Sequence, residues 1–481
     1  MKVKNRKTWK NSIKHEKAQP VQFIKTGDVA ELSMIINDAR LNGFPIKAVG
    51  SGHSFNDIAC SNGYMVDISE MNKLLKLPSF VRPTNKKLVQ VEAGITIRHL
   101  NNELDKLDLS VINLGGIDHQ TIAGAIATAT HGSGIGLQAI HGMVRSLVLV
   151  AGDGKIYRIE PANGISDPAI HNEPGVMLVQ NDDDFNAVLV SLGCMGIISS
   201  YILEVADMYW LKESKTMCKW SEIKPKLLDK SLLNEARHVM VLVNPYETKG
   251  DHNCLVTRIN ITSDKPQTWL EKVRSLAARK FSEWRIVYWY ARLKFWLFSR
   301  STPKLIDRSI KSLRDESYIN KAHFVLYQGS EFVKERAFDA EFAFDINADH
   351  VSIIEKIFET TKHFKEKGKI YMTSPVGMRF VKASDAFLAP EYKRDICYID
   401  TPFLQGTVGA DELLEALQDL MFAAGGFPHW GKKNSRLSAH PAVIAKTFPK
   451  LETWKMIQKK YDPAGLFANN YTARFLLTGN D

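Results

Sequence analysis

The hydrophobic positions of residues 1–205 change repeatedly between a helical period and a strand period, which is typical of an α+β domain. These periods predict helices at residues 30–36 and 97–107 and strands at residues 64–68, 87–94 and 197–205. Residues 146–150 and 155–159 flank Gly152-Asp153-Gly154, and two apolar runs around such a turn predict a β-hairpin.

After residue 206 the chain contains fewer glycines and more aromatic residues, and strands alternate with longer helices. Strands are predicted at residues 238–243, 255–261, 338–346 and 395–400. Residues 351–367 have a helical period, and Gly368 is placed to end that helix. The change in character predicts a domain boundary near residue 205, with a second domain at residues 206–428.

A loop of small residues follows the apolar run 44–48. It reads Val49-Gly50-Ser51-Gly52-His53-Ser54-Phe55. Glycine permits positive φ and a close approach between the main chain and a ligand, so a strand that ends in this loop is typical of a phosphate cradle. An ordinary glycine-rich turn beside a surface histidine is the alternative interpretation.

Two later segments share this richness in small residues. Residues 113–134 are dense in Gly, Ala and Thr, and the hydroxyls of Thr121, Thr128 and Thr130 are suited to bind a pyrophosphate or ribityl chain. Residues 191–198 again place small side chains before a β-branched run. Such segments favour a flat, extended ligand lying against the backbone; the alternative is a tightly packed Ala/Gly helix.

In this order, the motifs resemble the FAD-binding domain of the vanillyl-alcohol-oxidase-type (PCMH-type) flavoproteins, in particular their aldonolactone oxidase and alditol oxidase branch. Near the C-terminus, His429-Trp430-Gly431-Lys432 and the segment 462–471 resemble two further signatures of that branch. The resemblance extends from Trp9 to Phe475 and is weakest in the middle of the chain.

The resemblance implies an α+β fold: an FAD-binding domain of two subdomains at residues 1–205, a cap domain with an antiparallel sheet at residues 206–428, and a segment at residues 429–481 that returns to the first domain. In the resembling enzymes the loop histidine bonds covalently to the flavin 8α carbon, and His53 occupies that position; a non-covalent FAD hydrogen-bonded by His53 is the alternative. The positions implied to bind FAD are Val49, Gly50, Ser51, Gly52, His53, Ser54, Gly115, Gly116, Thr121, Gly124, Thr128, His131, Gly132, Gly193, Gly196, Ile198 and Asn469.

The resemblance also implies residues for alcohol oxidation, which passes a hydride from carbon to flavin N5 and requires positive charge near the reduced ring. Lys432 matches the family's active-site lysine, and His429 is placed to orient the ring or the substrate. Arg379 matches the arginine that contacts the substrate hydroxyl, with Thr401 on the following strand as a neighbour. A solvated Lys432-Lys433 pair is the alternative for the lysine.

One position departs from the family pattern. Gly377 stands where the aldonolactone and alditol branch has glutamate, so Arg379 loses an ion-pair neighbour and the pocket is expected to be wider and less polar. Glu341 is a candidate to replace the charge, but a surface-facing carboxylate is the favoured interpretation for that residue.

Residues 284–300 combine three tryptophans and two tyrosines with interspersed cations. This pattern is typical of an interfacial helix that contacts an anionic membrane or guards a pocket for lipid-like substrates. A cap helix with a wide buried face is the favoured alternative.

The net charge of +10 and the pI of about 9.1 are compatible with nucleic acid, an anionic surface or solubility alone. Because no basic strip with interleaved aromatic residues lies on a recognised module, nucleic acid is not expected as a partner. Five scattered cysteines without a CxxC pair indicate neither a metal site nor a disulfide framework. With no signal peptide and no bilayer-spanning run, a cytoplasmic or membrane-surface location is expected.

The sequence therefore predicts an FAD-dependent oxidoreductase that oxidises a CH–OH group of a small alcohol or lactone, with molecular oxygen as acceptor. Sugar lactone, alditol and a bulkier hydrophobic alcohol such as a sterol are the substrates in order of preference. An inactive FAD-binding interaction module and an NAD(P)H-dependent reductase are the alternatives, although no further Gly-x-Gly-x-x-Gly motif is present for a nicotinamide cofactor.

Overall fold

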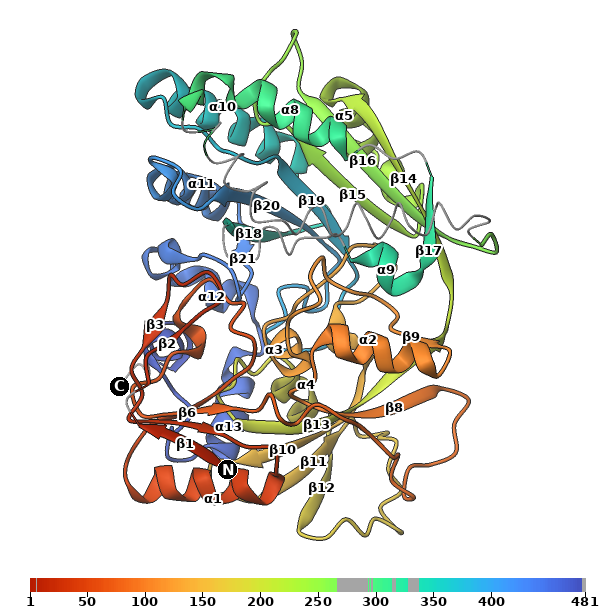
Figure 1. The fold of residues 1–481 in the computed structure, drawn as a ribbon, viewed down its shortest axis with the longest axis vertical. Coiled ribbons are helices and arrows are strands. Elements are labelled where there is room, and N and C mark those ends of the chain that lie inside the picture. Colours follow the sequence, from red (N-terminus) through yellow and green to blue (C-terminus); the bar gives the residue numbers. More distant parts are fainter. Residues whose placement is uncertain are drawn as a thin grey trace.

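The computed structural model describes residues 1–5, 7–265, 293, 295, 297–313, 317–327 and 337–477. In Figure 1 the two sheets from the N-terminal part of the chain lie in the lower half of the molecule, and the large sheet from the rest of the chain lies above them. The predicted α+β organisation, with an antiparallel sheet in the second part, is confirmed.

The first sheet holds the strand that leads into the His53 loop. Its strands, in spatial order, are β1 (Lys2–Asn5), β4 (Gln22–Lys25), β6 (Tyr64–Asp67) and β5 (Ile46–Val49). Strands β4 and β5 both pair with β6 in parallel, so a crossover is needed between them. Helix α1 (Val29–Leu41) supplies it and begins at Asp28, whose side chain accepts from the N–H groups of Ala30 and Glu31. A two-stranded hairpin of β2 (Trp9–Lys10) and β3 (Lys17–Ala18) precedes this sheet.

The second sheet, as far as the described residues show it, has seven strands and contains the predicted hairpin. In spatial order these are β12 (Val176–Gln180), β11 (Ile156–Glu160), β10 (Val144–Ala151), β13 (Gly196–Asp207), β8 (Lys87–Glu92) and β7 (Leu74–Leu75), with β9 (Leu109–Ser110) beside the end of β13. Strands β10 and β11 are antiparallel, as the turn between them predicts. The helices in the segments between the strands of this second sheet are α2 (Ile97–Lys106), α3 (Ile122–Ala127) and α4 (Asp182–Leu189).

Within the described residues the third sheet has eight strands, each antiparallel to its neighbours. Their spatial order is β17 (Tyr318–Lys321), β14 (Trp210–Lys219), β16 (Asn253–Thr262), β15 (His238–Val243), β19 (Val376–Val381), β20 (Ile396–Leu404), β18 (Ala337–Asp345) and β21 (Phe427–Pro428). Helices α5 (Trp220–Leu228), α8 (Thr302–Ser312), α10 (His350–Gly368) and α11 (Ala410–Ala423) cover the face turned away from the first two sheets (Figure 1). The short helix α9 (Ala322–Leu326) lies beside β17, at the edge of the third sheet that is nearer to the N-terminal part in Figure 1. The other face of strands β18, β19 and β20 therefore points toward the N-terminal part of the chain.

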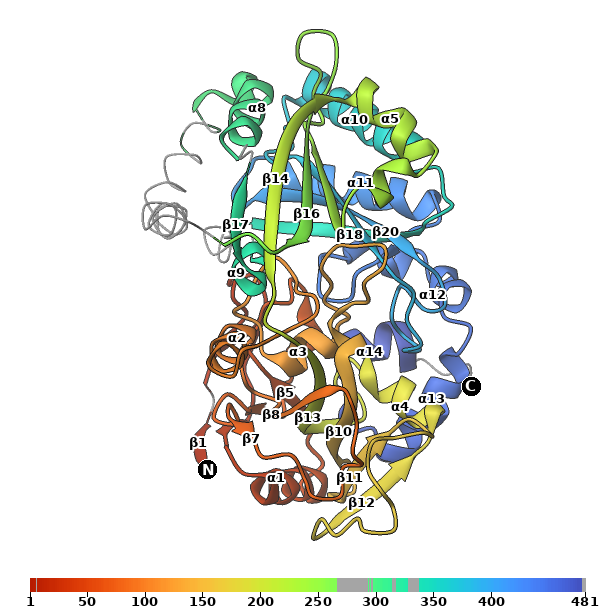
Figure 2. The ribbon, with the colours of Figure 1, turned by 90° about the vertical axis from the view of Figure 1, so that its right-hand side faces the viewer.

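The chain then crosses back to the N-terminal sheets. Helix α12 (Ala442–Thr447) leads to α13 (Leu451–Tyr461), which packs beside α4 (Figure 2), and to the short α14 (Asn470–Thr472). The N–H of Ile46 donates to the carbonyl oxygen of Leu466 at 2.8 Å, and the N–H of Gly152 donates to that of Tyr461 at the same distance. These bonds join the last part of the chain to β5 and to the β10–β11 turn.

One helix ends at a different residue from the one expected from the sequence. Helix α10 includes Gly368, and the left-handed residue that ends it is Lys369, with φ of 51°, so the expected helix end is wrong by one position. Most of the aromatic segment 284–300 lies outside the described residues. Across the described ranges, none of the helices combines the length and apolar character needed to cross a bilayer.

Candidate active site

Two adjoining cavities form the candidate site: the first lies within the N-terminal part, the second lies between that part and the third sheet, and His53 lines both of them. The first has a volume of about 930 Å³ and is lined by the loop after β5, the start of α3 and the loop before β13. The second has a volume of about 1070 Å³ and extends to β18, β19 and β20. Ser54, Gln120 and Thr128 also line both cavities, so the two form one continuous site.

The loop after β5 approaches α3 so closely that only glycine fits at its start. A Cβ atom on Gly50 would lie 2.0 Å from Oγ1 of Thr121, far inside contact distance. Thr121 is the N-cap of α3, where its Oγ1 accepts from the N–H of Gly124 at 3.4 Å. Backbone and small side chains from both elements therefore form one wall of the first cavity.

Most of the predicted cofactor positions line these cavities. Those in the first are Val49, Gly50, Ser51, Gly52, His53, Ser54, Thr121, Gly124, Thr128, Gly193, Gly196 and Ile198, and those in the second include Gly115, Gly116 and His131. Two predicted positions line neither cavity. Gly132 packs against the carbonyl of Leu114, and the side chain of Asn469 bonds to a neighbouring loop.

Lys47 lines the first cavity and was missed by sequence analysis. Its buried Nζ donates to the carbonyl oxygens of Leu192 at 3.1 Å and Gly193 at 3.0 Å. Burial lowers the pKa of Lys47, with the charge of Asp462 acting in the opposite direction. Lys47 thus connects the loop before β13 to strand β5. A single lysine within an otherwise apolar strand is the feature of the sequence that could have identified it.

The second cavity receives charged side chains from one face of the third sheet. Glu341 on β18 is directly opposite Asp400 on β20, and Asp400 is directly opposite Gly377 on β19. Directly opposite residues, and residues two apart on one strand, project from the same face. Asp339, Glu341, Asp400 and Arg379 accordingly all line the cavity.

Lys432 forms an ion-pair cluster with two of these carboxylates. Its Nζ lies 2.8 Å from Oδ2 of Asp339 and 3.6 Å from Oε2 of Glu341. Burial alone would lower the pKa of Lys432, but the two carboxylates raise it above its ordinary value. Burial opposes ionisation of Glu341 as well, yet Lys432 and His131 hold the pKa of Glu341 well below its usual range. The cluster keeps a permanent cation inside the cavity.

The rings of His131, Tyr398 and His429 pack against one another beside this cluster. His131 stacks on Tyr398 with ring centroids 3.6 Å apart, and its Nε2 lies 3.3 Å from Oε1 of Glu341. Nδ1 of His429 accepts from the N–H of Gly431 at 3.0 Å, so the proton of that neutral ring is on Nε2. Burial lowers the pKa of His429 to about 3, which keeps the ring neutral.

The structure corrects two sequence-based placements. Thr401 follows Asp400 in β20 and therefore projects from the opposite face, where its Oγ1 donates to the carbonyl of Ala340 at 3.1 Å. Its expected place beside Arg379 in the site is wrong. Glu341 was expected to face the surface, but it is only 2% exposed and belongs to the Lys432 cluster.

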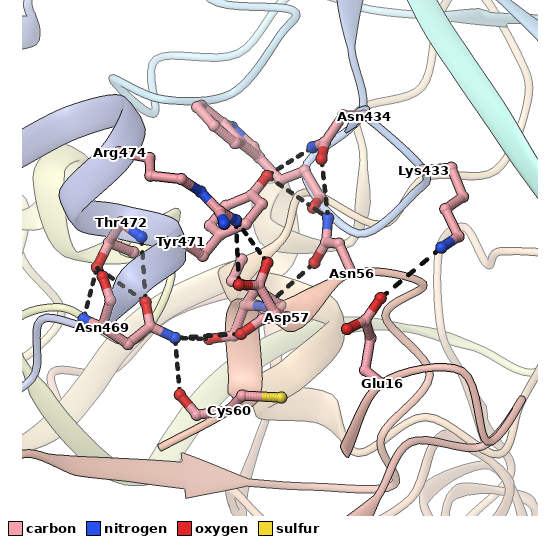
Figure 3. A network of polar contacts seen from close by, with 12 residues as sticks. Glu16, Asn56, Asp57, Cys60, Lys433, Asn434, Asn469, Tyr471, Thr472 and Arg474 are labelled. Carbon is pink, nitrogen blue, oxygen red and sulfur yellow. Dashed lines mark hydrogen bonds and ion pairs between the residues drawn. The ribbon is translucent and has the colours of Figure 1, made fainter. Parts of the chain in front are cut away.

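A polar network fastens the segment containing Lys432 to the His53 loop (Figure 3). The side-chain amide of Asn56 donates to the carbonyl oxygens of Trp430 at 2.7 Å and Lys432 at 2.9 Å. That of Asn469 donates to three carbonyls of the turn at residues 57–60, at 2.9–3.2 Å. Arg474 pairs with Asp57 at 2.8 Å. These contacts fix the segment that carries Lys432 relative to the loop that carries His53.

The network gives Asn469 a structural role that can be tested. Replacing Asn469 with alanine leaves three carbonyls without their shared donor, so we expect a loss of about 1–3 kcal/mol in the free energy of unfolding. Urea unfolding followed by fluorescence measures it. Asn470→Ala, at the exposed neighbouring position, is the matched control and should unfold like the wild type. Equal stability of the two variants would contradict the assigned role.

Comparison with known sequences gives two family matches. Residues 20–160 match the family described as FAD binding domain, and residues 202–475 match the family described as D-arabinono-1,4-lactone oxidase. An L-gulono-1,4-lactone dehydrogenase of Mycobacterium tuberculosis is 26% identical over 97% of this chain and 99% of its own length. An L-gulonolactone oxidase of Mus musculus is 26% identical over 96% of this chain and 97% of its own.

Solved structures share the fold at lower sequence identity. A solvent-stable cholesterol oxidase superposes with a TM-score of 0.73 at 15% identity, covering 98% of both chains. A cholesterol oxidase from B. sterolicum also has a TM-score of 0.73, at 12% identity, covering 99% of this chain and 97% of its own. At such identities the likeness concerns the fold, and it agrees with the architecture described above.

Proposed function

The chain belongs to the D-arabinono-1,4-lactone oxidase family, because residues 202–475, more than half of its length, match that family, and we propose that it oxidises a CH–OH group of a sugar 1,4-lactone. It is an FAD-dependent oxidoreductase, as the matches of both parts of the chain indicate. The observation that carries the proposed substrate class is the second cavity, where the Lys432 cluster, Arg379 and Asp400 surround a polar space beside His53.

The residues of the continuous site fit FAD. The first cavity offers backbone and small side chains to a pyrophosphate and ribityl chain, and Gly50 allows the loop to close on α3. The second cavity offers the cation of Lys432 to a ring that becomes negatively charged on reduction. When bound, FAD supplies the acceptor for the hydride that leaves the alcohol carbon.

The side chains of this chain perform the remaining tasks. Arg379 is placed to donate hydrogen bonds to the reacting hydroxyl oxygen and to stabilise the negative charge that develops as its proton leaves. Asp339 and Glu341 keep Lys432 protonated. His429 is a positioning residue, since the N–H of Gly431 occupies its Nδ1 and the bond orients the segment that carries Lys432.

The proposed activity is tested by mixing the yellow protein with L-gulono-1,4-lactone without oxygen. We expect the flavin absorbance to bleach, and in air we expect hydrogen peroxide to form in step with lactone consumption. Bleaching by the lactone without oxygen, together with lactone-dependent reduction of an artificial electron acceptor but no peroxide in air, would make the protein a dehydrogenase rather than an oxidase. Absence of bleaching with both L-gulono- and D-arabinono-1,4-lactone would contradict the proposed function.

Covalent attachment of the flavin through His53 is part of the proposal, supported by the position of His53 where the two cavities join. We expect the yellow colour to stay with the protein pellet after acid precipitation. His53→Ala is expected to release the colour to the supernatant. The matched control is His119→Ala, because its ring lies 6.5 Å from that of His53 outside both cavities. Wild-type flavin released by acid would contradict covalent attachment.

A further inference from the structure

The space at Gly377 is filled by a carboxylate from the neighbouring strand. A Cβ atom on Gly377 would lie 1.9 Å from Oδ1 of Asp400, its directly opposite partner in the β19–β20 pair. The expectation that Gly377 makes the pocket wider and less polar is therefore wrong. The cavity keeps a carboxylate at this place, and glycine at 377 is what gives that carboxylate room.

Charged groups from two neighbouring strands and from the segment after β21 act on Asp400. These are Arg379 from β19, Glu341 and Asp339 from β18, and Lys432 from the segment after β21. Burial raises the pKa of Asp400 to about 6, the charge of Arg379 acts in the opposite direction, and the two other carboxylates add to the rise. Asp400 is thus ionised at neutral pH but sensitive to mild acid.

The carboxylate of Asp400 also has an unused acceptor. Its Oδ1 is buried and has no hydrogen-bond partner among the described residues. Oδ1 of Asp339 is likewise buried without a partner among the described residues, but the other oxygen of that carboxylate, Oδ2, accepts from Nζ of Lys432 at 2.8 Å. A buried acceptor without a donor is costly, and such groups in native structures are usually satisfied by a ligand or water. Since Asp400 lines the second cavity, a molecule bound there can supply the donor.

We propose that Asp400 accepts a hydrogen bond from a hydroxyl group of the substrate other than the one that is oxidised, beside Arg379. This inference rests on the proposed function and specifies its substrate class as polyhydroxy compounds, which include sugar lactones and alditols. A sterol with a single hydroxyl group would leave the Asp400 carboxylate without a donor, so the site disfavours it. Asp400 is therefore a specificity-determining residue presented through the gap at Gly377.

The first test compares two probes that differ in their hydroxyl groups. L-gulono-1,4-lactone carries several, whereas α-hydroxy-γ-butyrolactone keeps one ring hydroxyl and lacks the others. In Asp400→Ala we expect kcat/KM for the first probe to fall about 10- to 100-fold relative to the second, the value of one hydrogen bond to a charged group. Asp395→Asn, just before the same strand and outside both cavities, is the matched control and should keep the wild-type ratio.

The pH profile provides a second reading of the same group. In the wild type, kcat/KM for L-gulono-1,4-lactone is expected to fall as the pH drops through about 6, because protonation removes the negative charge that strengthens the hydrogen bond to Asp400 and turns one of its oxygens into a donor. Asp400→Asn retains the shape but has no such ionisation, so this limb of the profile should be lost. A merely structural carboxylate would change stability without removing the limb.

A double-mutant cycle tests the pairing of the two positions. Gly377→Ala is expected to displace the Asp400 carboxylate and to lower both thermal stability and the selectivity ratio. In the Asp400→Ala background the same change meets no carboxylate, so Gly377→Ala should then have little further effect. Flavin content, measured for every variant, reports whether the cofactor site itself has survived.

The outcomes separate this inference from the function on which it rests. A wild-type protein that oxidises neither probe, nor D-arabinono-1,4-lactone, overturns the proposed function and the role of Asp400 together. A wild-type protein that oxidises L-gulono-1,4-lactone, with the same selectivity ratio in Asp400→Ala, overturns the role of Asp400 alone. Additive effects of Gly377→Ala and Asp400→Ala would overturn the inference that the Asp400 carboxylate occupies the space left by the missing side chain at Gly377.

Discussion

Replacing Lys432 with methionine is expected to abolish most of the turnover and to destabilise the fold. The substitution keeps the length of the side chain but leaves the carboxylates of Asp339 and Glu341 buried without their cation. Removing one partner of a buried ion pair costs about 3–5 kcal/mol, and removing a charge that stabilises the transition state costs about 100- to 1000-fold in kcat. Oxygen uptake with L-gulono-1,4-lactone and urea unfolding measure the two effects.

The neighbouring lysine provides the control. Lys433 lies 3.7 Å from Glu16 and lines neither cavity, so Lys433→Met removes the same charge from the same segment outside the site. We expect Lys433→Met to retain flavin and turnover near the wild-type level. Loss of turnover in both variants, or in neither, would contradict the special role given to Lys432.

Replacing Gly50 with alanine is expected to produce a protein with little flavin. The added Cβ atom would lie 2.0 Å from Oγ1 of Thr121, so the loop must move away from α3 and the first cavity must change shape. Inserting a methyl group into a closely packed position costs about 1–3 kcal/mol, equivalent to about 10- to 100-fold in cofactor affinity. The ratio of flavin to protein in the purified variant measures the loss.

Gly136 allows a matched comparison, because nothing lies within 4 Å of a Cβ atom built there. Gly136→Ala should therefore retain the wild-type content of flavin. Adding Thr121→Ala to Gly50→Ala removes the hydroxyl that obstructs the new methyl group, so we expect partial recovery of flavin binding. Full flavin content in Gly50→Ala alone would show that the loop does not need its close approach to α3.

Elements with a strong hydrophobic period could be predicted from the sequence with good accuracy. The strand at residues 238–243 has the predicted bounds, and the hairpin around Gly152-Asp153-Gly154 pairs as expected. The end of α10 was less predictable, because the left-handed conformation is adopted by Lys369 instead of the glycine before it. Patterns of burial extend over many residues, whereas a helix end depends on one residue and its local bonds.

The loops expected to bind the cofactor could also be predicted from the sequence, because their pattern of small residues is local. Gly50 to Ser54 and Thr121 to Thr128 are contiguous stretches rich in small residues, and the structure brings both to one cavity. In contrast, the sequence did not predict from which face of a strand a single residue projects. Thr401 and Asp400 are neighbours in the sequence, yet Thr401 projects away from the second cavity and Asp400 lines it. Only the register of β20 against β18 and β19 distinguishes them.

By itself the sequence determined the class of fold, the positions of the loops that suit FAD, and the motifs that carry Lys432 and Arg379. Each of these depends on residues that are close together along the chain. The tertiary structure alone decided that Glu341 is buried beside Lys432 and that Asp400 fills the space above Gly377. Those relations join strands that are distant in sequence, and charges shape a common cavity only after the sheet has brought them together.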